Sequence, residues 1–323
     1  MKPFHAHHPA IGAGTSLLAG EDGSDCVLQR VSEPDACLGL FVGIRQSPAL
    51  PWRMLPLFAA APAGGAEPFE VLTPGRYGRT FAFASDRWLI GPLVFKLCTP
   101  WWVTASPDAC DREMARLHFA PSIGGFVEYD NTHSEEPVEV IVGMGAPGAG
   151  FEVIAKDMIG FVAGGRVGFA TALSADVRSR TGGAPFAEGL TSRGDYAALV
   201  FKIPAATKRV FPFAVGFFDP YDATQLHRSL FGSVEEVMAS ALANNSEVIR
   251  RADELDAAWF GSPGPWEEKV AHAHAVRSHL AASSVARKDS GWKLTRPKDS
   301  GLGSFDAEFF PWAGAGTAPN SEL

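Results

Sequence analysis

The sequence has few cysteines, more acidic than basic residues, and no long hydrophobic run. Only four of the 323 residues are cysteine and no two form a CxxC pair, which excludes a disulfide scaffold and predicts buried thiols in a reducing compartment. The 28 lysines and arginines against 36 aspartates and glutamates argue against a phosphate-binding surface, so no nucleic-acid partner is expected. The longest apolar stretches, such as 38–44 and 212–218, are much shorter than the roughly 20 residues of a membrane helix, and no membrane partner is expected.

The sequence also lacks a signal peptide and the common catalytic and phosphate-binding motifs. Lys2 and the polar run Phe4–Pro9 that follows it do not make a signal peptide, which predicts a cytoplasmic protein. No GxSxG nucleophile elbow, GxGxxG loop after a strand, Walker loop or HExxH zinc motif occurs. Pro147 interrupts the glycine-rich segment Gly143–Gly150, and we expect a flexible turn there rather than a phosphate-binding loop.

The first two thirds of the chain have the pattern of many short strands. Glycine and proline recur at short intervals, and β-branched and aromatic residues cluster between them. Helical periodicity is absent, so the fold class is mainly β, and residues 1–228 are predicted to form one large antiparallel β-sandwich of more than ten strands. The candidate strands are Cys37–Arg45, Arg79–Phe83, Leu93–Thr99, Gly125–Tyr129, Val138–Val142, Gly165–Ala172, Ala197–Ile203 and Val210–Phe218.

The pattern changes to helix near Ser233. Ser233 and Glu236 form a capping-box pair, and apolar residues at three- and four-residue spacing predict one helix of about 25 residues, ending near Trp259. Pro265 suits the first turn of a second helix, so residues 229–288 are predicted to be a helical segment. Two helices cannot close a domain, so they must pack on the sandwich, pair with another chain, or begin a larger helical domain. Residues 289–323 are predicted to be irregular and disordered.

Histidines and paired carboxylates are the candidate chemical groups. For His5, His7 and His8 we favour a polar, partly exposed N-terminus. Contact with a sugar is the second alternative. A metal site is the third, because one pair of histidines on one face supplies too few ligands. For His272, His274 and His279 we favour solvated or core-edge positions. The pairs Glu235/Glu236 and Glu267/Glu268 lie in first turns of helices and complement the helix dipoles, while Glu135/Glu136 suit a solvated turn.

Several segments, taken in order, resemble the β-xylosidases of glycoside hydrolase family 52. The resemblance covers roughly residues 1–285, and its first and last segments are the most specific. The segments are Phe4–Ala13, Leu40–Ile44 with Ser47-Pro48, Phe81–Trp88 with Gly91 and Phe95, Asp130–Thr132, Val210–Val215, Val234–Val237 and Ala271–Ser278.

This resemblance implies an N-terminal β-sandwich followed by an (α/α)6 barrel, of which this chain would contain only the first helices. It implies a retaining β-xylosidase that hydrolyses β-1,4-xylo-oligosaccharides or aryl β-xylosides, with an oligosaccharide as partner. No cofactor and no metal are expected, because glycoside hydrolysis needs only carboxyl groups and water. A homodimer is among the expected assemblies.

The chain departs from the family where the catalytic nucleophile should lie. The Asn-Glu-Gly-Glu-Tyr-Arg segment that follows the second helix in the family has no counterpart in 291–299, so neither catalytic carboxylate carries over. Asp306 and Glu308 are the acidic residues nearest that position and become the catalytic candidates, and His7 and His8 are hypothesised to hydrogen-bond sugar hydroxyls. The alternative is a non-catalytic carbohydrate-binding or interaction sandwich, or a truncated fragment that lacks the catalytic carboxylates.

Overall fold

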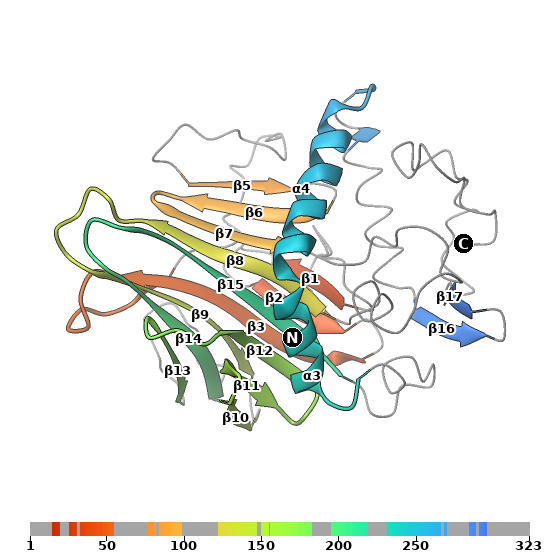
Figure 1. The fold of residues 1–323 in the computed structure, drawn as a ribbon, viewed down its shortest axis with the longest axis horizontal. Coiled ribbons are helices and arrows are strands. Elements are labelled where there is room, and N and C mark those ends of the chain that lie inside the picture. The colour runs from red at the N-terminus through yellow and green to blue at the C-terminus, as the bar shows by residue number, and fades with distance from the viewer. Residues whose placement is uncertain are drawn as a thin grey trace.

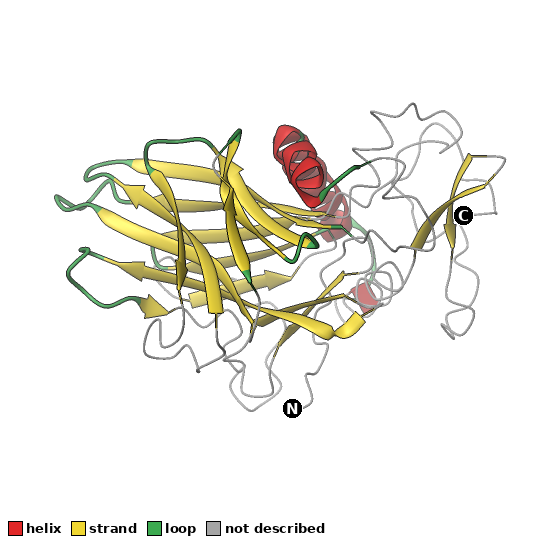
Figure 2. Ribbon diagram, turned by 90° about the horizontal axis from the view of Figure 1, so that it is seen from below, coloured by secondary structure: helices red, strands yellow, loops and turns green. Residues whose placement is uncertain are grey.

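The described chain is mainly β, with two large antiparallel sheets, one two-stranded sheet and two helices (Figure 1). The computed structural model describes residues 15–19, 26–30, 33–54, 77–81, 84–98, 122–146, 150–154, 156–182, 195–218, 231–265, 268–269, 284–288 and 291–295. The two large sheets face each other as layers, and a helix lies outside one of them (Figure 2). The predicted large sandwich of more than ten strands is confirmed.

The first large sheet has seven strands, six of them in one continuous order. This order is β1 (Thr15–Ala19), β2 (Cys26–Arg30), β3 (Glu33–Arg45), β9 (Val138–Ala146), β14 (Asp195–Ile203) and β13 (Val177–Gly182), and β4 (Arg53–Met54) pairs with β3. Because β3 and β14 both pair with β9, residues distant in sequence share one row across the sheet. Arg45 lies opposite Glu139, which lies opposite Lys202.

The second large sheet has eight strands and is crossed by the helices. Its order is β10 (Phe151–Ile154), β11 (Met158–Ala163), β12 (Val167–Ala172), β15 (Lys208–Phe217), β8 (Ser122–Asp130), β7 (Leu93–Cys98), β6 (Ser85–Ile90) and β5 (Tyr77–Phe81).

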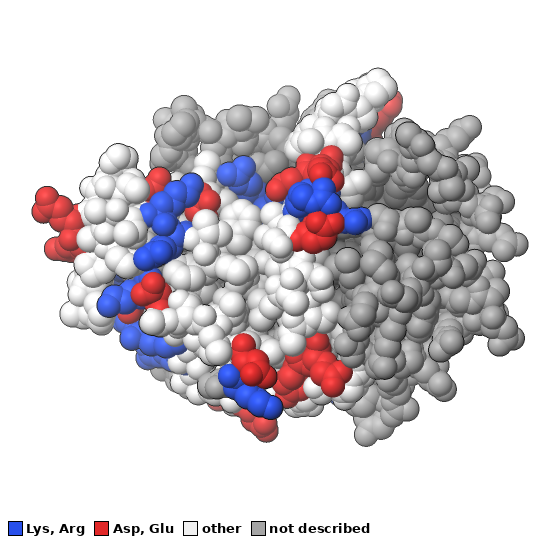
Figure 3. All heavy atoms as spheres, viewed as in Figure 1, with Lys and Arg blue, Asp and Glu red and all other residues white. Residues whose placement is uncertain are grey.

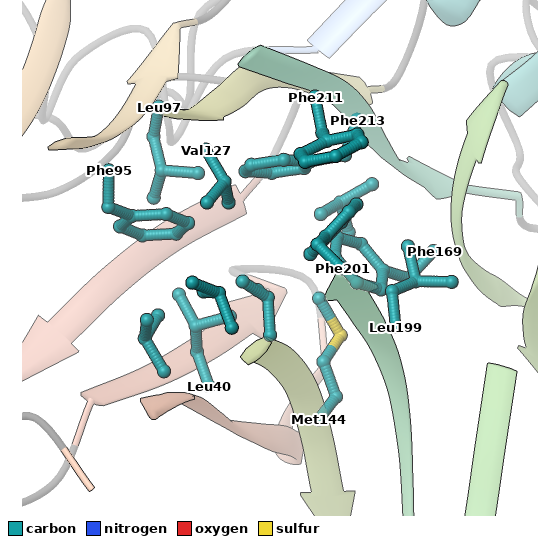
Figure 4. Close-up of a cluster of buried hydrophobic side chains, with 14 of the residues drawn as sticks. Leu40, Phe95, Leu97, Val127, Met144, Phe169, Leu199, Phe201, Phe211 and Phe213 are labelled. Carbon is teal, nitrogen blue, oxygen red and sulfur yellow. The ribbon is translucent and has the colours of Figure 1, made fainter. Parts of the chain in front are cut away.

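The main core fills the space between the two sheets. It is rich in phenylalanine, and the ring centroid of Phe213 lies 5.5 Å from that of Phe95 and 5.2 Å from that of Phe169 (Figure 4). The first sheet contributes aliphatic side chains such as Val142 and Leu199 from the opposite side. Alternate residues of each strand face this core, which explains why the strands were visible in the sequence as apolar clusters.

Each predicted strand overlaps a strand of the structure, with two differences at the glycines. Gly143 and Gly145 lie within β9 instead of beginning a turn, because they sit where neighbouring strands leave little room: a Cβ on Gly143 would come within 2.5 Å of the Ala197 carbonyl oxygen. Gly165 has a φ of 65° and belongs to the turn before β12 rather than to the strand.

The sequence predicted one continuous helix from Ser233 to Trp259, and this prediction is wrong because the structure has two helices there. Helix α3 spans Val234–Ala243 and α4 spans Asn245–Gly261, with Asn244 between them at φ −101° and ψ 3°. The apolar spacing continues across the break and conceals it in the sequence. Both helices pack on the outer face of the eight-stranded sheet, which is one of the predicted arrangements for the first predicted helix. The other two alternatives, pairing with another chain and the start of a larger helical domain, stay predictions.

Glycines on that outer face allow the close approach of α3. A Cβ on Gly216 would lie 2.8 Å from Cγ of Met238, and Gly168 is also covered by Met238. Met238, Val237 and Phe231 form a second buried cluster with Val162 of the sheet. The helix therefore has its apolar side on the sandwich, and Glu235 and Glu236 lie in its first turn as predicted.

Ser233 caps the helix as predicted, and the Glu236 carboxylate bonds one residue earlier than a strict capping box would place it. The Glu236 backbone N–H donates to Ser233 Oγ at 3.4 Å, and the Gly232 N–H donates to Glu236 Oε2 at 2.9 Å. We expect Ser233→Ala to lower the free energy of unfolding by about 1 kcal/mol, because a helix-end donor loses its acceptor. Urea denaturation measures this. Ser246→Ala, at an exposed position of α4, is the control and should change stability by only a few tenths of a kcal/mol; equal effects of the two variants would contradict the cap.

The end of the predicted helical segment is strand instead. Ser284–Lys288 forms β16 and pairs with β17, Gly291–Thr295, so helix does not extend to residue 288 and the segment from 289 onwards is not wholly irregular. The two strands are neighbours in sequence, and helical periodicity in the preceding residues does not reveal such a local pairing. The body of the predicted second helix and the tail after 295 lie outside the described residues, and the domain boundaries stay predictions.

Candidate functional site

Polar side chains gather where α4 crosses the strands β6, β7 and β8. Five of them make up what we call the polar junction, and three come from the helix. Buried polar groups are costly unless they are hydrogen-bonded, so a cluster of them marks either a functional site or a specific attachment. The residues of the polar junction are Ser85, Lys96, Asn245, Asp253 and Asp256.

Asp256 is the most buried carboxylate on the helix, with 6% of its surface exposed. Its Oδ1 accepts the Ala84 backbone N–H at 2.5 Å, and its Oδ2 accepts the Ser85 hydroxyl at 2.6 Å. Both oxygens are therefore occupied by donors from the start of β6. Hydrogen bonds to an ionised acceptor are stronger than neutral ones, so this carboxylate fastens the helix to the start of β6.

Asn245 bonds to the backbone of β8 much as a neighbouring strand would. The Gly125 N–H donates to Asn245 Oδ1 at 3.1 Å, and Asn245 Nδ2 donates to the Gly125 carbonyl oxygen at 2.9 Å. A Cβ on the adjacent Gly124 would lie 2.5 Å from Asn245 Oδ1, so glycine is needed for this approach. The side-chain amide thus hydrogen-bonds both backbone polar groups of one residue of the sheet, which attaches the start of α4 to β8.

Lys96 and Asp253 form an ion pair at the rim of the polar junction. The Lys96 side chain is 6% exposed and the Asp253 side chain is 60% exposed, so the pair bridges interior and solvent. Further out, α4 carries Glu247, Arg250, Arg251 and Glu254 in ion pairs along its own surface. Figure 3 shows charges of both signs gathered over this helix, with largely uncharged surface beside it.

Cys98 lies beside the polar junction and is a buried free thiol, as predicted for the cysteines. Burial raises the pKa of the Cys98 thiol far above its ordinary value, and the nearby Lys96 charge opposes this only in part. Since the thiolate is the reactive form, we expect Cys98 to resist iodoacetamide in the native protein and to react once the chain is unfolded. Peptide mass mapping of alkylated samples measures this; complete native alkylation of Cys98 would contradict it.

The buried carboxylates of the described residues are all engaged. Glu139 accepts from Arg45 at 2.7 Å and from Arg178 at 2.8 Å, Asp256 is held as above, and Asp86 also has an interaction partner. Glycosidase chemistry needs two carboxyl groups on opposite sides of a bond, about 5 to 10 Å apart, with room for sugar and water between them. The polar junction, with both oxygens of Asp256 occupied, has the chemistry of an attachment instead.

The residues predicted for catalysis and sugar contact lie outside the described ranges. These are His7, His8, Asp306 and Glu308. The paired Glu135 and Glu136 are exposed, as expected for a solvated turn. Within the described ranges, no group of three or more His, Cys, Asp or Glu side chains could hold a metal ion. No helix in those ranges is long and apolar enough to cross a membrane.

The sequence interpretation missed the polar junction, although α4 gave a signal for it. The buried positions of α4 are Asn245, Val248, Ala252, Asp256 and Trp259, a regular helical stripe in which two members are polar. A carboxylate within such a stripe is expensive to bury without donors, so it predicts donors on the facing element. What the sequence could not supply was the identity of those donors, which lie 171 and 172 residues away.

Comparisons with known proteins give the relationship directly. Residues 18–294 match the model of Glycosyl hydrolase family 52. Two proteins named Beta-xylosidase, both from Geobacillus stearothermophilus, are 22% identical to the chain over 350 and 347 residues. The alignments cover 94% of this chain but 56% and 48% of those proteins, so the chain spans about half the length of the curated relatives it matches.

A solved structure described as "Putative kojibiose phosphorylase from human microbiome" aligns with 62% of this chain and 26% of its own, at 6% identity and a TM-score of 0.29. That similarity is too low to add to the argument. The family model, in contrast, matches well over half of the chain, and its range contains the resembling segments from Leu40–Ile44 to Ala271–Ser278. The chain therefore belongs to glycosyl hydrolase family 52.

Proposed function

We propose that the chain acts as a glycoside hydrolase of the β-xylosidase type, with β-1,4-xylo-oligosaccharides or aryl β-xylosides as substrates and with retention of configuration. The observation that carries the proposal is the family match over 18–294 together with two relatives named as β-xylosidases. The mainly β architecture with two docked helices supports it, because it is the arrangement that the family resemblance implied. We further propose a cytoplasmic location, because four cysteines without a CxxC pair suit a reducing compartment.

The helices α3 and α4 would be the first helical elements leading from the sandwich towards an (α/α)6-type domain. Their attachment is specific, since Asn245 and Asp256 together accept or donate four hydrogen bonds across the interface. Such a joint fixes the direction in which the chain leaves the sandwich. A helical domain that follows it would then be held in a defined position relative to the sheets.

The catalytic carboxylates of such an enzyme would come from outside the described residues. Within this chain Asp306 and Glu308 remain the proposed candidates, and His7 and His8 are proposed to donate hydrogen bonds to sugar hydroxyls. Two carboxyl groups suffice for retaining hydrolysis, one as nucleophile and one as acid and base, so the mechanism requires no metal.

The test is the release of p-nitrophenol from p-nitrophenyl β-xyloside by the purified chain, with the β-glucoside as a second substrate. We expect β-xyloside turnover that falls by at least a hundredfold in Asp306→Asn or Glu308→Gln, and is unchanged in the matched control Asp157→Asn at an exposed turn. His7→Ala and His8→Ala should raise KM. Absence of turnover at high protein concentration would overturn catalysis by this chain.

A second candidate function is binding of carbohydrate without turnover. It is favoured by one observation, that the buried carboxylates of the described residues are all engaged by other groups. This function predicts saturable binding of xylotetraose, seen by isothermal titration calorimetry, with no hydrolysis of xylotetraose or of the aryl xyloside. Binding without hydrolysis would select the second function over the first.

A further inference from the structure

We draw no further inference here: the strongest candidate, the exposed apolar patch of Pro48, Ala49, Leu50 and Pro51 in the loop between β3 and β4, carries none because nothing in the structure shows what covers it.

Discussion

Phe213→Ala is expected to lower the free energy of unfolding by about 4 kcal/mol, because it removes a large side chain from the centre of the main core. Phe213 is fully buried and stacks on Phe95 at 5.5 Å, with an interplanar angle of 11°. It also meets Phe169 edge-on, so one ring links three strands of the eight-stranded sheet from the inner side (Figure 4). Truncation removes this burial and leaves a cavity that the surrounding strands cannot close.

Urea denaturation measures the change, as a lower midpoint with an unchanged slope. Phe260→Ala is the matched control, because its side chain is 42% exposed at the end of α4, and it should cost less than about 1 kcal/mol. Phe213→Leu keeps more of the volume and should fall between the two. Similar losses for Phe213→Ala and Phe260→Ala would show that the rings between the sheets are not the main source of stability.

Several strands were not predicted from the sequence, and for β6 and β13 the polar residues give a reason. The strand at residues 138–142 was predicted, because its alternate residues are apolar and face the core. Strand β6, which begins Ser85-Asp86-Arg87, was not predicted. Ser85 is nevertheless buried, because its hydroxyl has a partner on α4. Strand β13 was not predicted for a related reason. It lies at the edge of its sheet, and Arg178 and Arg180 give it a charged face, so its hydrophobic alternation is weak.

The helix boundaries show a second limit of the sequence. The start of α3 was predictable from Ser233, because a helix cap and the N–H that it accepts are only three residues apart in sequence. The break at Asn244 depends instead on the sheet, since Asn245 turns its amide to the backbone of Gly125. A contact across 120 residues has no local signature, so periodicity alone extended one helix through it.

The polar junction and the predicted sugar and catalytic residues differ in how far the sequence could predict them. The polar junction was not predicted, since its donors and acceptors come from distant segments, although Asp256 in an apolar stripe was a usable signal. His7 and His8 were predicted from the N-terminal histidine cluster, and Asp306 and Glu308 from their nearness to the expected catalytic segment. They lie outside the described residues and stay predictions, whereas the family itself was recognisable from short motifs spread along the chain.

Asp256→Ala is expected to lower the free energy of unfolding by about 3 kcal/mol, next in size to the loss in Phe213→Ala. The substitution leaves the Ala84 N–H and the Ser85 hydroxyl without their acceptor in a buried place, and each unsatisfied group costs about 1 to 3 kcal/mol. Asp256→Asn keeps one acceptor oxygen and the shape of the side chain, so its loss should be smaller, about 1 kcal/mol. Glu254→Ala is the control on the same helix, because Glu254 is exposed and its ion pair with Arg250 lies at the surface.

Hydrogen exchange distinguishes an attachment from a general stabiliser. If Asp256 fastens α4 to the start of β6, then Asp256→Ala should accelerate exchange of the α4 amides and of Ala84 before it affects β9 or β14 in the other sheet. Without this attachment, α4 would no longer hold a fixed orientation relative to the sandwich. Any activity that depends on residues after α4 would then decrease. Uniform acceleration across both sheets would contradict a local joint, and an unchanged exchange pattern would show that Asp256 does not hold the helix on the sheet.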